Sequence, residues 1–77
     1  MTRELYASKS CPYCAEVRGQ LDGDGIDYVE YDVEADAAAR ERLIALTGPN
    51  AMVPVLVDDG RVTQVGAGGR GCYVGRG

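Results

Sequence analysis

Residues 8–17 read SKSCPYCAEV. They place Cys11 and Cys14 three positions apart, directly after RELYA at 3–7, which alternates like a short strand. Pro12 suits the first turn of a helix, because a helix does not use the N–H that proline lacks there. Both cysteines are therefore expected where a strand ends and a helix begins, a position that favours redox chemistry at a Cys-x-x-C motif.

The other elements are predicted from hydrophobic periodicity and turn residues. A helix from about Cys11 to Leu21 is followed by IDYVEYDVE at 26–34, which reads as a strand. Asp36 caps a second helix through ADAAARERLIALTG, and VPVLVDDG and RVTQV at 53–65 have the form of two strands joined by an Asp-Gly turn. The residues expected to share one face of each helix are Cys14, Val17 and Leu21 on the first, and Ala39, Leu43 and Leu46 on the second.

The predicted order, β-α-β-α-β-β, indicates an α/β fold with a mixed four-stranded sheet. A strand–helix–strand unit gives a parallel pair, and the closing hairpin is antiparallel. Residues 1–66 are expected to form this domain. The last twelve residues, GAGGRGCYVGRG, contain six glycines and no apolar period, so residues 67–77 are expected to form a Gly-rich loop or frayed tail.

Composition and charge exclude several classes of protein. The 77 residues, 45% of them hydrophobic and 26% charged, suit one small globular domain without a membrane-spanning stretch. A net charge of −4 without a basic cluster argues against nucleic acid as a partner. No apolar run of signal-peptide length occurs near the start, so a cytoplasmic location is expected. The chain contains no histidine, which excludes Ser-His-Asp and Cys-His catalysis.

Three cysteines and no histidine cannot close a structural zinc site within one chain by themselves, so no metal site is predicted there. Two chains could still hold a metal or an iron–sulfur cluster between them. The redox interpretation is favoured, because unpaired N–H groups at a helix start stabilise a thiolate. Cys11 is expected to be the nucleophile, and Cys14, a turn deeper, the resolving thiol. A purely structural Cys14 is the alternative.

With CPYC at 11–14 after a strand, and Val53-Pro54 about forty residues later, residues 3–68 resemble the glutaredoxin family. The resemblance implies a thioredoxin-like fold in which a cis Val53–Pro54 peptide faces the active-site cysteines. The final helix of that fold is short or missing here. It also implies an enzyme, a thiol–disulfide oxidoreductase that reduces protein disulfides or glutathione mixed disulfides by a dithiol mechanism, leaving Cys11 and Cys14 joined.

Glutathione is the expected co-substrate, and no tightly bound cofactor is expected. The residues expected to bind glutathione or substrate are Lys9, Pro12, Tyr13, Val53, Pro54, Gly66 and Gly68. Met52 stands where the family usually has Thr, and no acidic residue follows Gly66 to engage the γ-glutamyl group. An electron carrier reduced by thioredoxin reductase, and a metal or iron–sulfur dimer using Cys11, are therefore alternatives. Pro12 counts against the dimer, because its ring would crowd a bridged cluster.

Cys72 lies in GGRGCYV, a tail that loosely resembles short glutaredoxin-like proteins with a redox residue near the C-terminus. It is a possible extra redox thiol that flexible glycines would let reach Cys11. An exposed, non-functional thiol is the favoured interpretation, since nothing nearby in the sequence fixes its geometry. Without the final helix, one face of the sheet is expected to be uncovered and apolar. Such a face favours dimerisation or docking onto a larger redox enzyme. The chain is expected to be a monomer or a weak homodimer.

Overall fold

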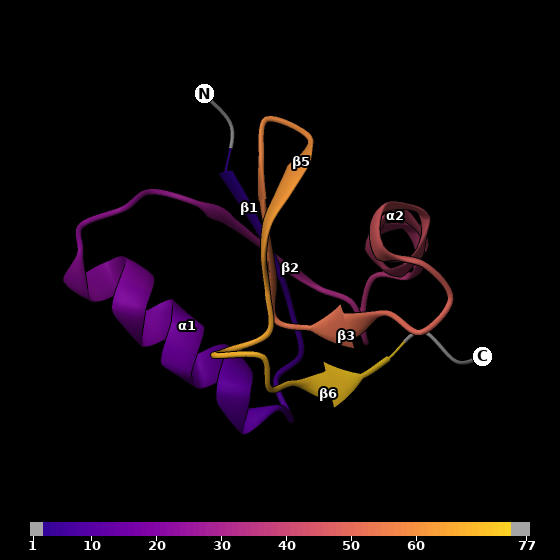
Figure 1. Cartoon of the computed structure of the whole chain (residues 1–77), viewed down its shortest axis with the longest axis horizontal. Coiled ribbons are helices and arrows are strands. Elements are labelled where there is room, and N and C mark those ends of the chain that lie inside the picture. The colour runs from indigo at the N-terminus through magenta and orange to yellow at the C-terminus, as the bar shows by residue number, and fades with distance from the viewer. Residues whose placement is uncertain (1–2, 75–77) are drawn as a thin grey trace.

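The computed structural model describes residues 3–74 and confirms the predicted α/β class (Figure 1). Its helices and strands are, in chain order, β1 (Arg3–Ala7), α1 (Pro12–Gly23), β2 (Val29–Asp32), α2 (Ala37–Thr47), β3 (Met52–Val53), β4 (Val55–Asp58), β5 (Arg61–Val65) and β6 (Cys72–Tyr73). Neither of its two helices is long and apolar enough to span a bilayer in the described part of the chain.

The main sheet has four strands in the order β2-β1-β4-β5 and is mixed, as predicted. β1 runs parallel to β2, with Leu5 opposite Glu30, and antiparallel to β4, with Leu5 opposite Leu56. The β4–β5 hairpin turns at Asp59 and Gly60, whose φ values of 51° and 81° are both left-handed. Asp-Gly is suited to such a turn, because glycine and aspartate tolerate positive φ better than most residues.

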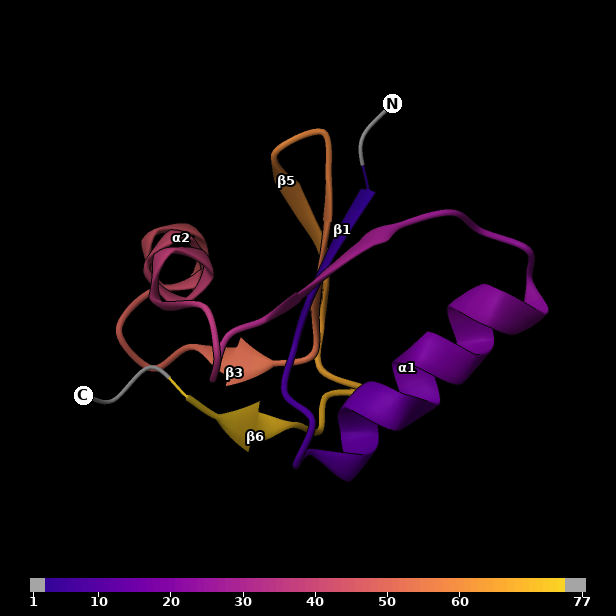
Figure 2. The same cartoon turned by 180° about the vertical axis from the view of Figure 1, so that it is seen from behind.

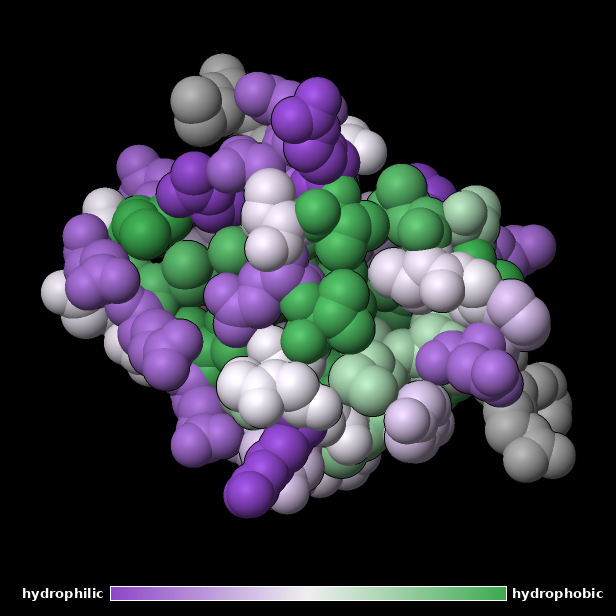
Figure 3. All heavy atoms as spheres, in the orientation of Figure 1, coloured by the Kyte–Doolittle hydropathy of each residue, from purple (hydrophilic) through white to green (hydrophobic). Residues whose placement is uncertain are grey.

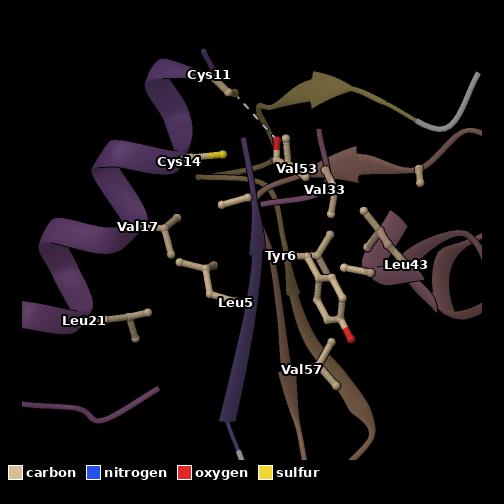
Figure 4. Packing of buried hydrophobic residues seen from close by; sticks show 14 residues of the cluster. Leu5, Tyr6, Cys11, Cys14, Val17, Leu21, Val33, Leu43, Val53 and Val57 are labelled. Carbon is tan, nitrogen blue, oxygen red and sulfur yellow. Dashed lines mark hydrogen bonds between the residues drawn. The ribbon is translucent and has the colours of Figure 1, made fainter. Parts of the chain in front are cut away.

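The two helices lie on opposite sides of this sheet (Figures 1 and 2). Because side chains alternate along a strand, Leu5 faces α1 while Tyr6 faces α2 and Leu43 (Figure 4). The expected stripe of α1, made of Cys14, Val17 and Leu21, is buried. The side chain of Asp36 accepts a hydrogen bond from the N–H of Ala39 at 3.2 Å, which confirms it as the cap of α2.

Three predicted elements differ from those observed. The second strand is shorter, because only Val29–Asp32 pair with β1 as the edge of the sheet. Leu46 lies in the last turn of α2 and is 40% exposed, so the buried face of that helix ends at Leu43. The expected strand from residue 53 is divided at Pro54, which has no N–H to donate to a ladder.

The C-terminal segment is the largest departure from expectation. Residues 72–73 form β6, which pairs antiparallel with β3 in a separate two-stranded sheet. The prediction of a loop or frayed tail is therefore wrong for these two residues, which have a backbone partner that local sequence does not reveal. The domain boundary at residue 66 stays a prediction, and residues 75–77 lie outside the described residues.

No helix follows β5 within residues 3–74, as predicted from the Gly-rich sequence of this segment, in which the chain departs from the family pattern. Figure 3 shows apolar side chains collected in the middle of one face of the molecule, with charged side chains around them. Large apolar residues that remain exposed are Val29, Leu46, Val65 and Tyr73. The expectation that a second copy or a larger redox enzyme covers an apolar face stays a prediction.

Candidate redox site

Cys11 is the N-cap of α1 and has extended backbone angles, φ −96° and ψ 117°. Pro12 occupies the first position of the helix, as its sequence position predicts. Pro12 has no N–H, and the N–H of Cys14 donates to the Cys11 carbonyl at 3.1 Å. The positive end of the α1 dipole lies at Cys11, so this end of the helix favours a negative charge. The Cys11 side chain is only 3% exposed and faces β3 (Figure 4).

Val53 and Pro54 lie opposite Cys11 and are joined by a cis peptide bond, as the resemblance implied. The Sγ atom of Cys11 is 3.9 Å from the carbonyl oxygen of Val53 (Figure 4). Both Val53 and Pro54 are buried. The start of α1 and the end of β3 therefore form one site, although 42 residues separate Cys11 from Val53.

The structure joins Cys11 to Cys72 by a disulfide, with their Cα atoms 6.1 Å apart and a separation of 61 positions in the sequence. Cys72 lies on β6, directly opposite Val53 in the β3–β6 ladder. It is partly buried and packs against the core. The expectation of an exposed, unplaced thiol at Cys72 is wrong, because a strand pairing holds this residue beside the N-terminus of α1.

Hydrogen bonds from the backbone and from one side chain hold β6 in place. Beyond the ladder, the N–H of Val74 donates to the carbonyl oxygen of Ala51 at 2.9 Å, and the Nε atom of Arg40 donates to the Val74 carbonyl at 2.9 Å. Gly71 lies so close to the Val53 carbonyl that a Cβ atom there would overlap it. A glycine at position 71 is therefore required for β6 to approach β3 this closely.

Cys14 has a different environment. Its side chain is fully buried on the core face of α1, and it is a free thiol. Burial raises the pKa of the Cys14 thiol, while the hydrogen bond from the Ser8 N–H, at 3.4 Å, and the positive charge of Arg18 offset part of that rise. A raised pKa keeps this sulfur protonated near neutral pH, and a protonated sulfur is a poor nucleophile.

The remaining predicted site residues are divided between the site and its margins. Gly66 is buried, and its N–H donates to the Pro54 carbonyl at 2.6 Å. Tyr13 is half-buried and packs against the core from the first turn of α1. Lys9, Pro12 and Gly68 are exposed. The structure therefore brings together Cys11, Val53, Pro54, Gly66 and Cys72, and gives Lys9 and Gly68 no buried contact.

Four residues near the site were not predicted from the sequence to belong to it. Ser8 and Glu34 are joined through the Ser8 hydroxyl, which donates to the Glu34 carboxylate and so holds the loop before α1 against the chain after β2. Arg40 and Gly71 fix β6. Of these, only Gly71 had a local signal, as the glycine directly before a cysteine, and that signal does not name its partner strand. Within residues 3–74, no three acidic or cysteine side chains are grouped to hold a metal ion.

The fold and the site together define a thioredoxin-like protein with a redox-type pair of cysteines. The structure superimposes with a TM-score of 0.73 on the crystal structure of a mutant of the thioredoxin-like protein BC3987, which is 38% identical in sequence. That match covers 83% of this chain and 81% of the other. The structure of BC3987 without the mutation gives a TM-score of 0.71 at 37% identity, over 80% of this chain and 84% of the other.

The glutaredoxin family model matches residues 4–63, and the chain belongs to the glutaredoxin family. It is 29% identical over 55 residues to glutaredoxin 3 of Escherichia coli strain K12, a match that covers 71% of this chain and 66% of that protein, just under two thirds of its length. It is 30% identical over 59 residues to an uncharacterised glutaredoxin-like 8.6 kDa protein in the rubredoxin operon of Clostridium pasteurianum, covering 77% of each chain.

Proposed function

We propose that this protein reduces protein disulfides or glutathione mixed disulfides, with Cys11 as the attacking thiolate and glutathione as the co-substrate that restores it. The observation that carries the proposal is the place of Cys11: it is the N-cap of α1, faces Val53, and lies within disulfide distance of a second thiol. A reducing compartment such as the cytoplasm suits this activity, because the enzyme must be returned to its thiol form.

The reaction needs one nucleophile and one resolving thiol. The Cys11 thiolate attacks one sulfur of the substrate disulfide, and the other sulfur leaves as a thiolate. A second thiol of the chain then attacks Cys11 Sγ and releases the rest of the substrate. The sequence predicts Cys14 for this step, and Cys72 is the other candidate because it lies within disulfide distance of Cys11. The substrate gains two electrons, the enzyme holds one disulfide, and two glutathione molecules reduce that disulfide while forming glutathione disulfide.

The positive end of the α1 dipole favours the thiolate form that Cys11 needs. An ordinary cysteine has a pKa of about 8.5, and helix N-termini lower it, which raises the thiolate fraction at neutral pH. The cysteinyl part of glutathione is proposed to lie along Val53, with Lys9 and Tyr13 beside the groove and the backbone of Gly66 and Gly68 near its carboxylate. These glutathione contacts are carried over from the family resemblance.

The test is reduction of a glutathionylated peptide, followed with glutathione plus glutathione reductase and, in a parallel assay, with thioredoxin reductase. We expect turnover with glutathione, and none for Cys11→Ser. Ala15→Ser provides a matched control, because Ala15 is exposed on the same helix and the variant also introduces a serine. Absence of turnover in both assays would contradict the proposed function.

One observation favours a second reductant. β6 occupies the edge of β3 at Val53, the position at which the cysteinyl backbone of glutathione is proposed to pair. A reductase that attacks the Cys11–Cys72 disulfide directly does not need that edge to be empty. If turnover is seen only with thioredoxin reductase, the protein is still an oxidoreductase, but its reductant is that enzyme and not glutathione.

A further inference from the structure

We propose that Cys72 is the thiol that resolves the Cys11 mixed disulfide, and that β6 occupies the edge of β3 along which the cysteine-bearing segment of a substrate binds. This inference rests on the proposed function and names its second thiol. It makes the substrate an extended peptide with a cysteine whose backbone can replace that of Cys72 opposite Val53.

The edge of β3 is the surface for which β6 and a substrate compete. Within the described residues, β3 belongs to a two-stranded sheet whose other strand is β6. Met52 pairs with Tyr73, Val53 pairs with Cys72, and the Ala51 carbonyl accepts from the Val74 N–H. When β6 leaves, these backbone groups become available, and an extended peptide can add to such an edge as a new strand. The register observed for Cys72 places the peptide's cysteine beside Cys11.

The two thiols that could attack Cys11 have contrasting environments. Cys14 is fully buried, its pKa is raised by that burial, and its sulfur already accepts a hydrogen bond from the Ser8 N–H. Cys72 is bonded to Cys11 and can leave and return with a short strand, because β6 has only two residues. The thiol that moves with β6 is therefore the one placed to reach Cys11 after a substrate has bound.

The catalytic steps follow from this competition for one edge. In the reduced protein β6 opens, a substrate disulfide docks on β3, and the Cys11 thiolate attacks it, releasing the first substrate thiolate. The Cys72 thiolate then attacks Cys11 Sγ, the Cys11–substrate bond breaks, and the second substrate sulfur leaves as a thiolate. When β6 returns, its backbone pairs with β3 in place of the substrate backbone. Resolution of the mixed disulfide and release of the product are therefore one event. Two thiols of the proposed reductant restore Cys11 and Cys72.

Gly71 provides a way to test the strand separately from the sulfur. A Cβ atom at position 71 would overlap the Val53 carbonyl, which is backbone and cannot rotate away. Gly71→Ala therefore keeps all three cysteines and hinders the docking of β6. Gly23→Ala is the matched control, because a Cβ there meets open space and Gly23 has no positive φ.

The experiment loads Cys11 with a chromophore and times its release. Each reduced protein is mixed with less than one equivalent of 5,5′-dithiobis(2-nitrobenzoic acid). Attack by Cys11 releases one thionitrobenzoate and leaves the other on Cys11, and resolution releases the second. The wild type, Cys14→Ser, Cys72→Ser and the double variant Cys14→Ser/Cys72→Ser are compared. The double variant has no second thiol of its own, so its slow second release, by Cys11 of another molecule, gives the intermolecular rate to subtract.

We expect Cys14→Ser to release the second thionitrobenzoate as fast as the wild type, and Cys72→Ser to be slowed at least about tenfold. Gly71→Ala is also expected to be about tenfold slower, as for an overpacked contact, and Gly23→Ala to be unchanged. Rapid second release from Cys72→Ser, or wild-type release from Gly71→Ala, would overturn the inference while leaving the proposed function intact. Failure of the first release in the wild type would instead contradict the proposed function.

Discussion

Cys14 and Cys72 are the two possible partners of Cys11, and they differ in almost every physical respect. Cys14 is three residues away on the same helix, fully buried, with its pKa raised by burial. Cys72 is 61 positions away, on a two-residue strand at the C-terminal end of the described chain, and is bonded to Cys11. The cysteine nearer in sequence is a free, buried thiol, and the farther one is bonded to Cys11.

The difference arises from how each side chain is oriented. Cys14 shares the buried face of α1 with Val17 and Leu21, so the helix directs its sulfur toward the sheet (Figure 4). Cys11 is the N-cap, before the helical repeat begins, and its side chain faces β3 instead. A strand that pairs with β3 therefore brings a cysteine to Cys11 more directly than the helix does.

Removal of Cys11 should have the largest effect on activity, because Cys14 and Cys72 can each act only as a partner of Cys11. Cys11→Ser is expected to abolish disulfide exchange, since a serine hydroxyl forms no mixed disulfide. The loss is measured as peptide deglutathionylation, with Ala15→Ser expected to retain the wild-type rate. Residual exchange in Cys11→Ser would mean that another thiol initiates the reaction.

Reduction of the Cys11–Cys72 disulfide should have the next largest effect, on stability. A disulfide that closes a loop of this length is worth about 4 kcal/mol in the chain-entropy model. Urea unfolding of the oxidised and reduced protein should therefore differ by up to that amount. Cys14→Ser should keep the difference, and Cys72→Ser should lose most of it. Equal stability of the two redox forms of the wild type would argue against this pairing.

Arg40→Ala tests how firmly the C-terminal end of β6 is held against β3. The guanidinium of Arg40 donates to the Val74 carbonyl, and loss of this hydrogen bond should weaken the docking of β6 by about 1 kcal/mol. Amide hydrogen exchange at Val74, whose N–H is bonded to Ala51, should then be about fivefold faster. Arg42→Ala is the control, because Arg42 lies on the same helix and donates to Tyr6 instead.

The raised pKa of Cys14 predicts a small dependence of stability on pH. The native state holds the Cys14 proton to a higher pH than the unfolded chain does, so the unfolded state binds fewer protons in the interval between the two pKa values. Stability is therefore expected to fall as pH rises through the unfolded value of about 8.5. In the oxidised protein neither Cys11 nor Cys72 titrates.

This dependence is measured as unfolding free energy against pH for oxidised wild type and oxidised Cys14→Ala. The wild-type curve should fall more steeply above the unfolded pKa of cysteine. Tyr28 also has a raised pKa, caused first by desolvation, but it is present in both proteins and cancels in the comparison. Parallel curves would show that Cys14 has an ordinary pKa in the native state.

Local sequence was sufficient to predict most of the fold. Strand alternation at 3–7, the proline at position 12 and the Asp36 cap each act within a few residues, and the structure contains the elements they predict. The family resemblance added the cis Val53–Pro54 peptide opposite Cys11. The CPYC motif also placed Cys11 correctly at the start of α1.

The pairing of Cys72 could not be predicted in the same way. β6 forms because the backbone of a two-residue segment finds the edge of β3, and backbone groups are the same in every sequence. Gly71 is required by that approach, but among six glycines in the last twelve residues it does not stand out. Because the motif supplies a second cysteine at position 14, sequence reasoning assigned the resolving role there.

Peptide mapping of the oxidised protein identifies the disulfide partner of Cys11. Trypsin cuts after Lys9, Arg18, Arg70 and Arg76, so Cys11 and Cys14 share the peptide 10–18 while Cys72 lies on 71–76. Mass spectrometry without reduction should find these two peptides linked, in the wild type and equally in Cys14→Ser. An unlinked peptide 71–76, with peptide 10–18 two hydrogens lighter, would show a Cys11–Cys14 disulfide and contradict the Cys11–Cys72 pairing.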